Sequence, residues 1–340
     1  MTEKWICWFD ELGQEWNDRV GKKCANLGEM TRMGLQVPSG FALSLDAYRH
    51  FVSRTGADEE IKCFLGGIDH GFETIEQFNE AGERLRGIIE SKPFPPEMKR
   101  EILSYYRELS LRCPGGETLA GSTRSAGAKS LPGQYETYLN VIGESDLLEN
   151  IIRVWSSTFN PRSLAARKQA GRPLEEAPIG VAVLQMVKAR TAGVLFTADP
   201  NSRDPSRMII EANWGLGESV VGGDAVPDVF ILDKDTLKVI DRTLGSKGRV
   251  VTFKETGVAE EDASSEKRNA FCLTDEEARE IGRVGKILEA HFGFPQDIEW
   301  AIEENQDLPG SLKLLQTRPE VMARQKPPVD QVIDMMVGWL

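Results

Sequence analysis

The chain has 340 residues, of which 40% are apolar and 28% charged, a composition typical of a globular protein large enough for two lobes. Its formal net charge of −12 argues against non-specific binding of nucleic acid, so a site for any anionic ligand must gather its cations locally. No apolar run reaches the length of a membrane span, the first residues lack a signal-peptide layout, and the five cysteines lack disulfide or zinc spacing. We therefore expect a cytoplasmic protein that contacts neither nucleic acid nor membrane.

The first part of the chain predicts a lysine-bearing turn and a helical scaffold. Residues 21–30 lead from a loop into a helical pattern that begins with Lys22 and Lys23, and a Pro-Ser-Gly turn at 38–40 precedes a short apolar strand. A lysine at the start of a helix is usually only solvated. Residues 45–113 carry apolar side chains at helical spacing, to which we assign a scaffolding role.

Residues 123–140 form the most informative stretch. They combine basic and hydroxyl side chains with glycines ahead of an apolar segment. Backbone amides freed by small residues and flanked by fixed cations suit a polyphosphate, so this stretch is a candidate phosphate loop. It has neither the Walker A spacing nor the dinucleotide fingerprint, and an ordinary surface loop is the alternative.

The middle of the chain alternates helical and strand patterns. Arg162 and Arg167 fall on a predicted helix, where they either contact phosphate or tie the lobes together. Residues 179–187 have the continuous apolar pattern of a buried strand, and 209–223 predict a strand that runs into a glycine turn. Glu218 after that turn could contact a ribose, order the loop or cap a helix. Residues 227–271 predict short strands and turns, with a mobile polar stretch at 260–265.

The last informative element is a predicted hairpin. Asp297 and Glu299 alternate on one strand and therefore share a face opposite Ile298, and Gln316 with Arg318 do the same on the next strand. Two carboxylates, an amide and a guanidinium on a common face are costly unless a metal ion and phosphates complete them. An exposed, charged sheet face is the alternative.

These motifs, in this order, resemble the N-terminal nucleotide-binding domain of the pyruvate phosphate dikinase and phosphoenolpyruvate synthase family, a distant ATP-grasp relative. The resemblance spans almost the whole chain and implies an α+β, ATP-grasp-like fold of two lobes with the ATP site between them. We expect an N-terminal lobe at 1–178, with the lysine turn, helical scaffold and phosphate loop. A C-terminal lobe at 179–323 would hold an adenine strand and the metal-binding hairpin, followed by a linker or docking tail at 324–340.

The resemblance also implies roles for single residues. Lys23, Arg124 and Arg318 match catalytic cations on the phosphates, while Glu299 and Gln316 match the ligands of Mg²⁺. Leu184 stands where the family has glutamine, with Gln185 next to it, so pairing of the adenine edge with the backbone is the expectation. The nucleotide-binding residues would be Lys23, Arg124, Ser130, Gly133, Thr137, Gln185, Met186, Glu218, Glu299, Gln316 and Arg318.

In that family, a histidine on a swivelling domain attacks the β-phosphorus of ATP and releases AMP. His50, His70 and His291 lack the family's Gly-rich histidine setting. The resemblance therefore implies the ATP-binding subunit of a split phosphotransferase that works on a histidine of a separate subunit. In extent it resembles the small ATP-binding subunit of phenylphosphate synthase, and the acceptor would then be phenol. In other split enzymes of this type the acceptor would be pyruvate or a similar compound.

Two alternatives stay open. The chain could be part of a self-contained or truncated synthase or antibiotic phosphotransferase, with further domains beyond Leu340. It could also be a non-catalytic, ATP-sensing regulatory subunit that acts through lobe closure.

Overall fold

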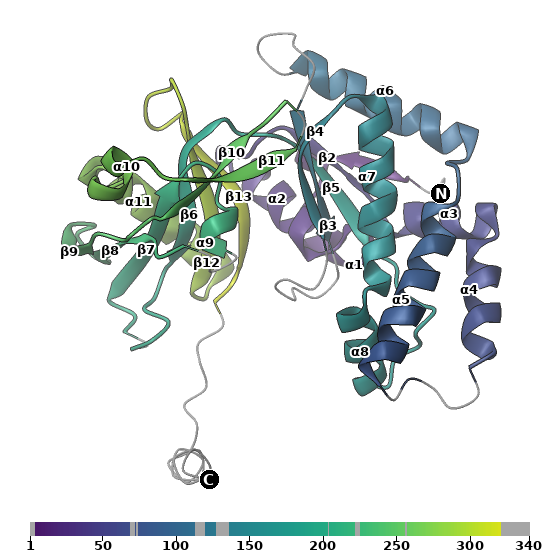
Figure 1. The fold of residues 1–340 in the computed structure, drawn as a ribbon. Coiled ribbons are helices and arrows are strands. Elements are labelled where there is room, and N and C mark those ends of the chain that lie inside the picture. The colour runs from purple at the N-terminus through teal and green to yellow at the C-terminus, as the bar shows by residue number, and fades with distance from the viewer. Residues whose placement is uncertain are drawn as a thin grey trace, which may run out of the picture.

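The computed structural model describes residues 4–68, 72, 74–112, 120–126, 136–202, 204–221, 225–255 and 257–320. Ser130 and Gly133 of the candidate phosphate loop, His70 and the tail at 324–340 lie outside the described residues. Helices and antiparallel sheets form an α+β fold of two lobes (Figure 1). No helix in the described part of the chain is long and apolar enough to cross a bilayer.

The first lobe is built on a five-stranded sheet in the order β1-β2-β5-β3-β4, in which all neighbours are antiparallel. The strands are β1 (Ile6–Trp8), β2 (Gly40–Leu43), β3 (Ala120–Ala126), β4 (Thr137–Ile142) and β5 (Gly180–Gln185). Strand β3 consists of small and polar residues with weak strand propensity. It forms because β4 and β5 pair with it on both sides, and such context outweighs propensity.

Helices cover one face of this sheet, where alternate strand residues such as Phe41 and Val183 join their apolar sides in one core. The predicted helical scaffold at 45–113 contains four of these helices. These four are α3 (Leu45–Thr55), α4 (Ala57–Gly66), α5 (Ile75–Glu90) and α6 (Pro96–Arg112). The others on this face are α7 (Glu144–Ser156), the 3-10 turn η3 (Ser157–Phe159) and α8 (Pro161–Gln169). The capping box of Thr74 and Gln77 fixes the start of α5, as its sequence favours.

The second lobe is built on a six-stranded antiparallel sheet in the order β13-β12-β6-β7-β8-β9. Its strands are β6 (Ala189–Phe196), β7 (Arg207–Trp214), β8 (Asp228–Asp233), β9 (Val239–Thr243), β12 (Gln296–Glu303) and β13 (Leu312–Pro319). Helix α11 (Asp275–Phe292) packs on one face, where Ile298 and Trp300 are buried. The other face carries the alternate residues of β12.

A separate two-stranded hairpin, β10 (Arg249–Phe253) and β11 (Val258–Asp262), follows β9. The expectation of a mobile stretch at 260–265 was wrong, because Glu260 to Asp262 pair with β10 and Ser264 caps the short helix α10 (Ser265–Asn269). The polar composition of β11 reflects an exposed strand rather than a lack of structure.

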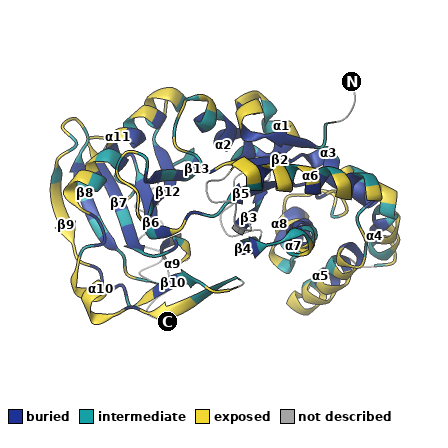
Figure 2. Cartoon of the chain, turned by 90° about the horizontal axis from the view of Figure 1, so that it is seen from above, coloured by how far each residue is buried: buried dark blue, intermediate teal, exposed yellow. Residues whose placement is uncertain are grey.

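The lobes meet around helix α2 (Lys22–Arg32), which follows the turns η1 (Phe9–Glu11) and η2 (Gln14–Trp16) and the short helix α1 (Asn17–Val20). Asn26 Nδ2 donates to the Thr317 carbonyl at 2.8 Å, and Leu314 N–H donates to the Gln36 carbonyl at 2.8 Å. Figure 2 shows buried strands in both lobes, with exposed surface on the outer helices. Strand β5 belongs to the first sheet, so the sheets change between Gln185 and Ala189, whereas the expected lobe boundary lies at 178/179.

Candidate active site

A polar row crosses the second sheet on the face away from α11. Glu299 pairs with Gln316 on β13 and with Val194 on β6, and Val194 pairs in turn with Glu211 on β7. Directly opposite residues in a sheet share a face, so Gln316, Glu299 and Glu211 lie on one side. Asp297 and Arg318, also paired in register, share this face and confirm the alternation expected from the sequence.

Arg318 and Asp297 form a close ion pair beside that row. Arg318 Nε and Nη2 lie 2.8 Å and 2.6 Å from Asp297 Oδ2. The other carboxylate oxygen, Oδ1, is buried with no hydrogen-bond partner among the described residues. Burial raises the pKa of the Asp297 carboxyl, and the nearby Arg318 opposes this shift.

Arg124 reaches this face from β3 of the first lobe. Its Nη2 donates to Glu299 Oε2 at 2.5 Å, and its Nη1 donates to the Leu315 carbonyl at 3.1 Å. Glu299 pairs with Gln316 while Trp300 pairs with Leu314, so Leu315 is the extra residue of a β-bulge. Burial would raise the pKa of Glu299, but Arg124 and Lys23 hold it below its ordinary value, so the carboxylate is ionised at neutral pH.

Lys23 enters the site from the first turn of α2. The residue before this helix, Gly21, has φ +82°, and a Cβ there would lie 2.0 Å from the Ala126 carbonyl oxygen. Glycine therefore allows the lysine turn to lie against the end of β3. Burial and the neighbouring Arg124 lower the pKa of Lys23 to about 8, while Glu299 acts in the opposite direction.

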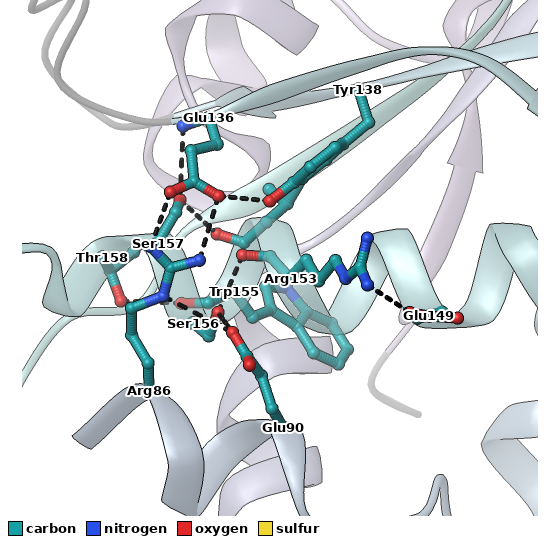
Figure 3. Close-up of polar contacts among 11 residues, drawn as sticks. Arg86, Glu90, Glu136, Tyr138, Glu149, Arg153, Trp155, Ser156, Ser157 and Thr158 are labelled. Carbon is teal, nitrogen blue, oxygen red and sulfur yellow. Dashed lines mark hydrogen bonds and ion pairs between the residues drawn. The ribbon is translucent and has the colours of Figure 1, made fainter. Parts of the chain in front are cut away.

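Both ends of the candidate phosphate loop are anchored. Within the stretch 123–140, Ala126 near its start lies against Gly21 of the lysine turn, and Glu136 lies towards its end. The Arg86 guanidinium of α5 holds both oxygens of Glu136, at 2.6 Å and 3.1 Å, and the Tyr138 hydroxyl bonds to the same carboxylate (Figure 3). The Glu136 N–H also donates to Ser157 Oγ at 3.4 Å. This network fixes the loop's second stem on the helical scaffold.

The remaining predicted positions lie around this centre. Thr137 is directly opposite Arg124 in the β3–β4 pairing. Gln185 ends β5, its N–H donating to the Ser39 carbonyl at 2.9 Å, and Met186 packs on an apolar cluster between the lobes. Glu218 begins the short helix α9 (Glu218–Val221); burial raises its pKa, and Arg124 opposes the shift.

The oxygen atoms present fit a divalent cation shared with phosphates. Gln316 Oε1 and Asp297 Oδ1 are buried without a hydrogen-bond partner among the described residues, and Glu299 is ionised beside them. Carboxylate and amide oxygens are the ligands that Mg²⁺ prefers, and it usually completes its shell with water and substrate phosphate. Within the described ranges, no group of three or more His, Cys, Asp or Glu side chains is arranged to hold a metal ion unaided.

Other basic residues have different positions. Arg167 is buried in the helical scaffold, donates to the Thr158 carbonyl at 2.8 Å and lies over the Phe159 ring, so it stabilises its own lobe. The sequence predicted no role for Glu211, and for Asp297 it predicted only that its side chain shares a strand face with Glu299. Glu211 is brought into the site by strand pairing, because Val194 of β6 lies between it and Glu299. No local sequence pattern predicts that pairing.

Comparisons with known proteins identify the family of the chain. The family model described as "Pyruvate phosphate dikinase, AMP/ATP-binding domain" matches residues 17–336. The chain belongs to this family. Its ATP-grasp-like domain here places the lysine turn, β3 and the β12–β13 hairpin around one centre.

Curated relatives of this dikinase domain are longer than the chain. A probable phosphoenolpyruvate synthase of Methanocaldococcus jannaschii is 35% identical over 322 residues, which are 93% of this chain and 26% of the relative. One from Staphylothermus marinus is 36% identical over 94% of this chain and 42% of its own length. The phosphoenolpyruvate synthase of Aeropyrum pernix is 32% identical over 98% and 45%. The chain thus spans less than half the length of these relatives.

Proposed function

We propose that this chain binds Mg-ATP between its lobes and activates the phosphates for a dikinase-type phosphotransferase. One observation carries the proposal: cations from both lobes, Lys23, Arg124 and Arg318, gather around Glu299 and Gln316. In a chain of net charge −12, cations at one place indicate a local anionic ligand. Membership of an ATP-binding family supports ATP as that ligand.

Each side chain has a role in this proposal. Lys23, Arg124 and Arg318 hold the phosphate oxygens and spread the charge that develops as a phosphoryl group moves. Glu299 and Gln316 would hold Mg²⁺, which when bound neutralises and orients the phosphates. Ser130, Gly133 and Thr137 of the loop would add hydroxyl and backbone donors. The backbone at Gln185 and Met186 would pair with the adenine edge, and Glu218 would contact the ribose.

The nucleophile of the proposed reaction comes from a separate subunit. A histidine nitrogen of that subunit bonds to the β-phosphorus, the bond to the oxygen bridging α and β breaks, and AMP leaves. Neither described histidine is placed for this step. The His50 ring packs at a tilt against Trp5, with 4.3 Å between ring centroids, and His291 Nε2 lies 2.7 Å from Glu29 Oε1.

The pyrophosphoryl-histidine then passes one phosphoryl to phosphate or water and the other to an acceptor. Relatives named phosphoenolpyruvate synthase favour pyruvate as that acceptor. Phenol is the acceptor if the chain acts as the ATP-binding subunit of a phenylphosphate synthase. This chain covers only 26–45% of the length of these relatives. The alternative to a separate subunit is therefore that this chain is part of a longer polypeptide, which carries the attacking histidine itself.

Nucleotide product analysis tests the proposal. The chain is incubated with Mg-ATP, alone and with a protein that carries a swivelling histidine domain, and AMP is resolved from ADP. We expect AMP only with the partner, and none when the chain carries Glu299→Gln. Glu303→Gln, near the end of the same strand and paired with Lys313, is the matched control and keeps activity. ADP as the product would contradict the proposal, and so would ATP binding without turnover, which a sensor would show.

A further inference from the structure

Hairpin β10–β11 is fixed at its base to the second lobe. Leu216 N–H donates to the Val251 carbonyl at 3.0 Å, and Asn213 Nδ2 donates to the Arg249 carbonyl at 2.9 Å. Gly215 has φ +75°, and a Cβ there would lie 2.4 Å from the Val251 carbonyl oxygen. The glycine turn after β7 therefore permits this close approach.

The tip of the same hairpin is held by the first lobe. Asn140 of β4 donates through Nδ2 to the carbonyls of Lys254 and Gly257, at 2.8 Å and 2.7 Å. The Gly257 N–H donates back to the Asn140 carbonyl at 3.3 Å. Asn140 is only 3% exposed, and both amide hydrogens are used. The hairpin thus bridges the lobes, with Asn140 as its fastening in the first lobe.

The backbone at Asn140 is shaped for this contact. Gly121 pairs with Val141 and Thr123 with Tyr138, so two residues of β4 oppose one residue of β3 in a β-bulge. Asn140 has φ +53°, a left-handed conformation that asparagine adopts more readily than most residues. Such conformations persist where surrounding contacts stabilise them. Here the hydrogen bonds from Asn140 to the hairpin tip provide that stabilisation.

Side chains of the hairpin join an apolar cluster that spans both lobes. Val251 is buried in it, and Phe253 and Val258 pack against it while partly exposed. Leu139, next to Asn140, and Met186, between the sheets, pack on the same cluster. Partly exposed apolar side chains contributed by both lobes are suited to the two faces of a flat heteroaromatic ring.

We propose that Asn140 is a positioning residue for the nucleotide base. By holding the hairpin tip, it keeps Phe253 and Val258 against the part of the apolar cluster that receives the adenine ring. This inference rests on the proposed function, because it takes ATP as the ligand. The proposed phosphate contacts come from α2, β3, β13, the phosphate loop and Thr137 at the start of β4, whereas Asn140 holds the hairpin tip, so loss of the Asn140 fastening weakens recognition of the base and spares that of the phosphates.

The test compares two ligands that share phosphates and differ in the base. Dissociation constants of Mg-ATP and Mg-tripolyphosphate are measured by calorimetry for the unchanged chain and for Asn140→Gly, which keeps the positive φ and removes both side-chain donors. We expect Kd for Mg-ATP to rise about tenfold, and Kd for Mg-tripolyphosphate to change less than about twofold. Asn305→Gly is the matched control, because Asn305 also has positive φ, at +60°, but lies in the β12–β13 turn.

A second variant keeps the inference testable if Asn140→Gly is unstable. Phe253→Ala leaves Asn140 intact and removes the ring that the hairpin presents, so it is expected to give the same selective loss. Equal weakening of both ligands, or no weakening of either, overturns the inference while the proposed function stands. If the unchanged chain binds neither ligand, the proposed function fails and the inference falls with it.

Discussion

Arg124 Nη2 lies 2.5 Å from Glu299 Oε2, so a cation expected on a phosphate is paired with a carboxylate expected on a metal ion. Arg318 and Asp297 repeat the arrangement on the second sheet. Each of these two ion pairs thus carries no net charge in the free chain. In the proposed function, Glu299 would hold Mg²⁺ and Arg124 the phosphates, so Mg²⁺ bound at Glu299 would free the Arg124 guanidinium for ATP, and each ligand would favour the other.

We therefore expect Mg²⁺ and ATP to bind with positive coupling. Saturating Mg²⁺ should tighten ATP binding by roughly tenfold or more in the unchanged chain. Glu299→Gln removes the carboxylate that the ion draws away, so the gain should shrink to about twofold or less. Calorimetric titration of ATP with Mg²⁺ or with a chelator measures the coupling. Glu303→Gln should keep the full effect, and equal coupling in both variants would contradict the idea.

The low pKa of Lys23 predicts a pH dependence of nucleotide binding. Burial and Arg124 lower it to about 8, and deprotonation removes the positive charge that the phosphates need. Affinity for Mg-ATP should be highest below pH 8 and fall as pH rises through 8 to 9. Lys23→Arg should abolish the fall, since a guanidinium stays charged in this range. The adjacent substitution Lys22→Arg should leave it in place; a fall that persists in Lys23→Arg would assign it to another group.

Gly21 is predicted to be the critical glycine of the lysine turn. Alanine there combines a positive φ of +82° with a Cβ 2.0 Å from the Ala126 carbonyl oxygen, so α2 must move away from β3. Gly34 has a similar φ of +74° but open space around its Cβ position. Gly34→Ala should lower the free energy of unfolding by about 1 kcal/mol, and Gly21→Ala by at least ~2 kcal/mol. Urea denaturation of both variants measures these free energies of unfolding. Equal decreases in the two variants would show that the backbone at Ala126 shifts at little cost to make room for the Cβ at position 21.

Arg86 is predicted to support phosphate binding from a distance. Arg86→Ala frees the Glu136 carboxylate and loosens the second stem of the phosphate loop, so binding should weaken about fivefold. Mg-ATP and Mg-tripolyphosphate should be affected alike, in contrast to Asn140→Gly. Arg153→Ala is the control from the same region, because Arg153 pairs at 2.5 Å with Glu149 on the surface of α7 (Figure 3). Unchanged affinity of the Arg86→Ala variant for both ligands would contradict a role of Arg86 in phosphate binding.

The sequence was informative where chemistry follows a local pattern. Strict alternation placed Asp297 and Glu299 on one face of β12, and the register with Gln316 and Arg318 confirms it. Lys23 and Arg124 could be assigned only through the family resemblance, because each stands on its own element. Their approach to Glu299 depends on how the two lobes meet.

Other features could not be predicted because they arise from pairing over long distances. Arg86 and Glu136 are 50 residues apart, and Asn140 meets Gly257 over a separation of 117 residues. The bulge at Leu315 exists only once β13 is paired with β12. Polar strand β11 was wrongly expected to be mobile, because its order comes from its partner β10 and not from its own composition.

The contact of Asn26 with Thr317 also bears on how the chain is made. The two residues are separated by 291 positions, and Leu314 reaches back to Gln36 in the same region. During synthesis, the Asn26 amide of α2 therefore has no acceptor until Thr317 of β13, 291 residues later, has been made. Until then, the apolar side of α2, including Leu27 and Met30, lacks the side chains of β13 that pack in the same core. The lysine turn reaches its final setting only after the ribosome has released β13, so the nascent first lobe exposes apolar surface until then.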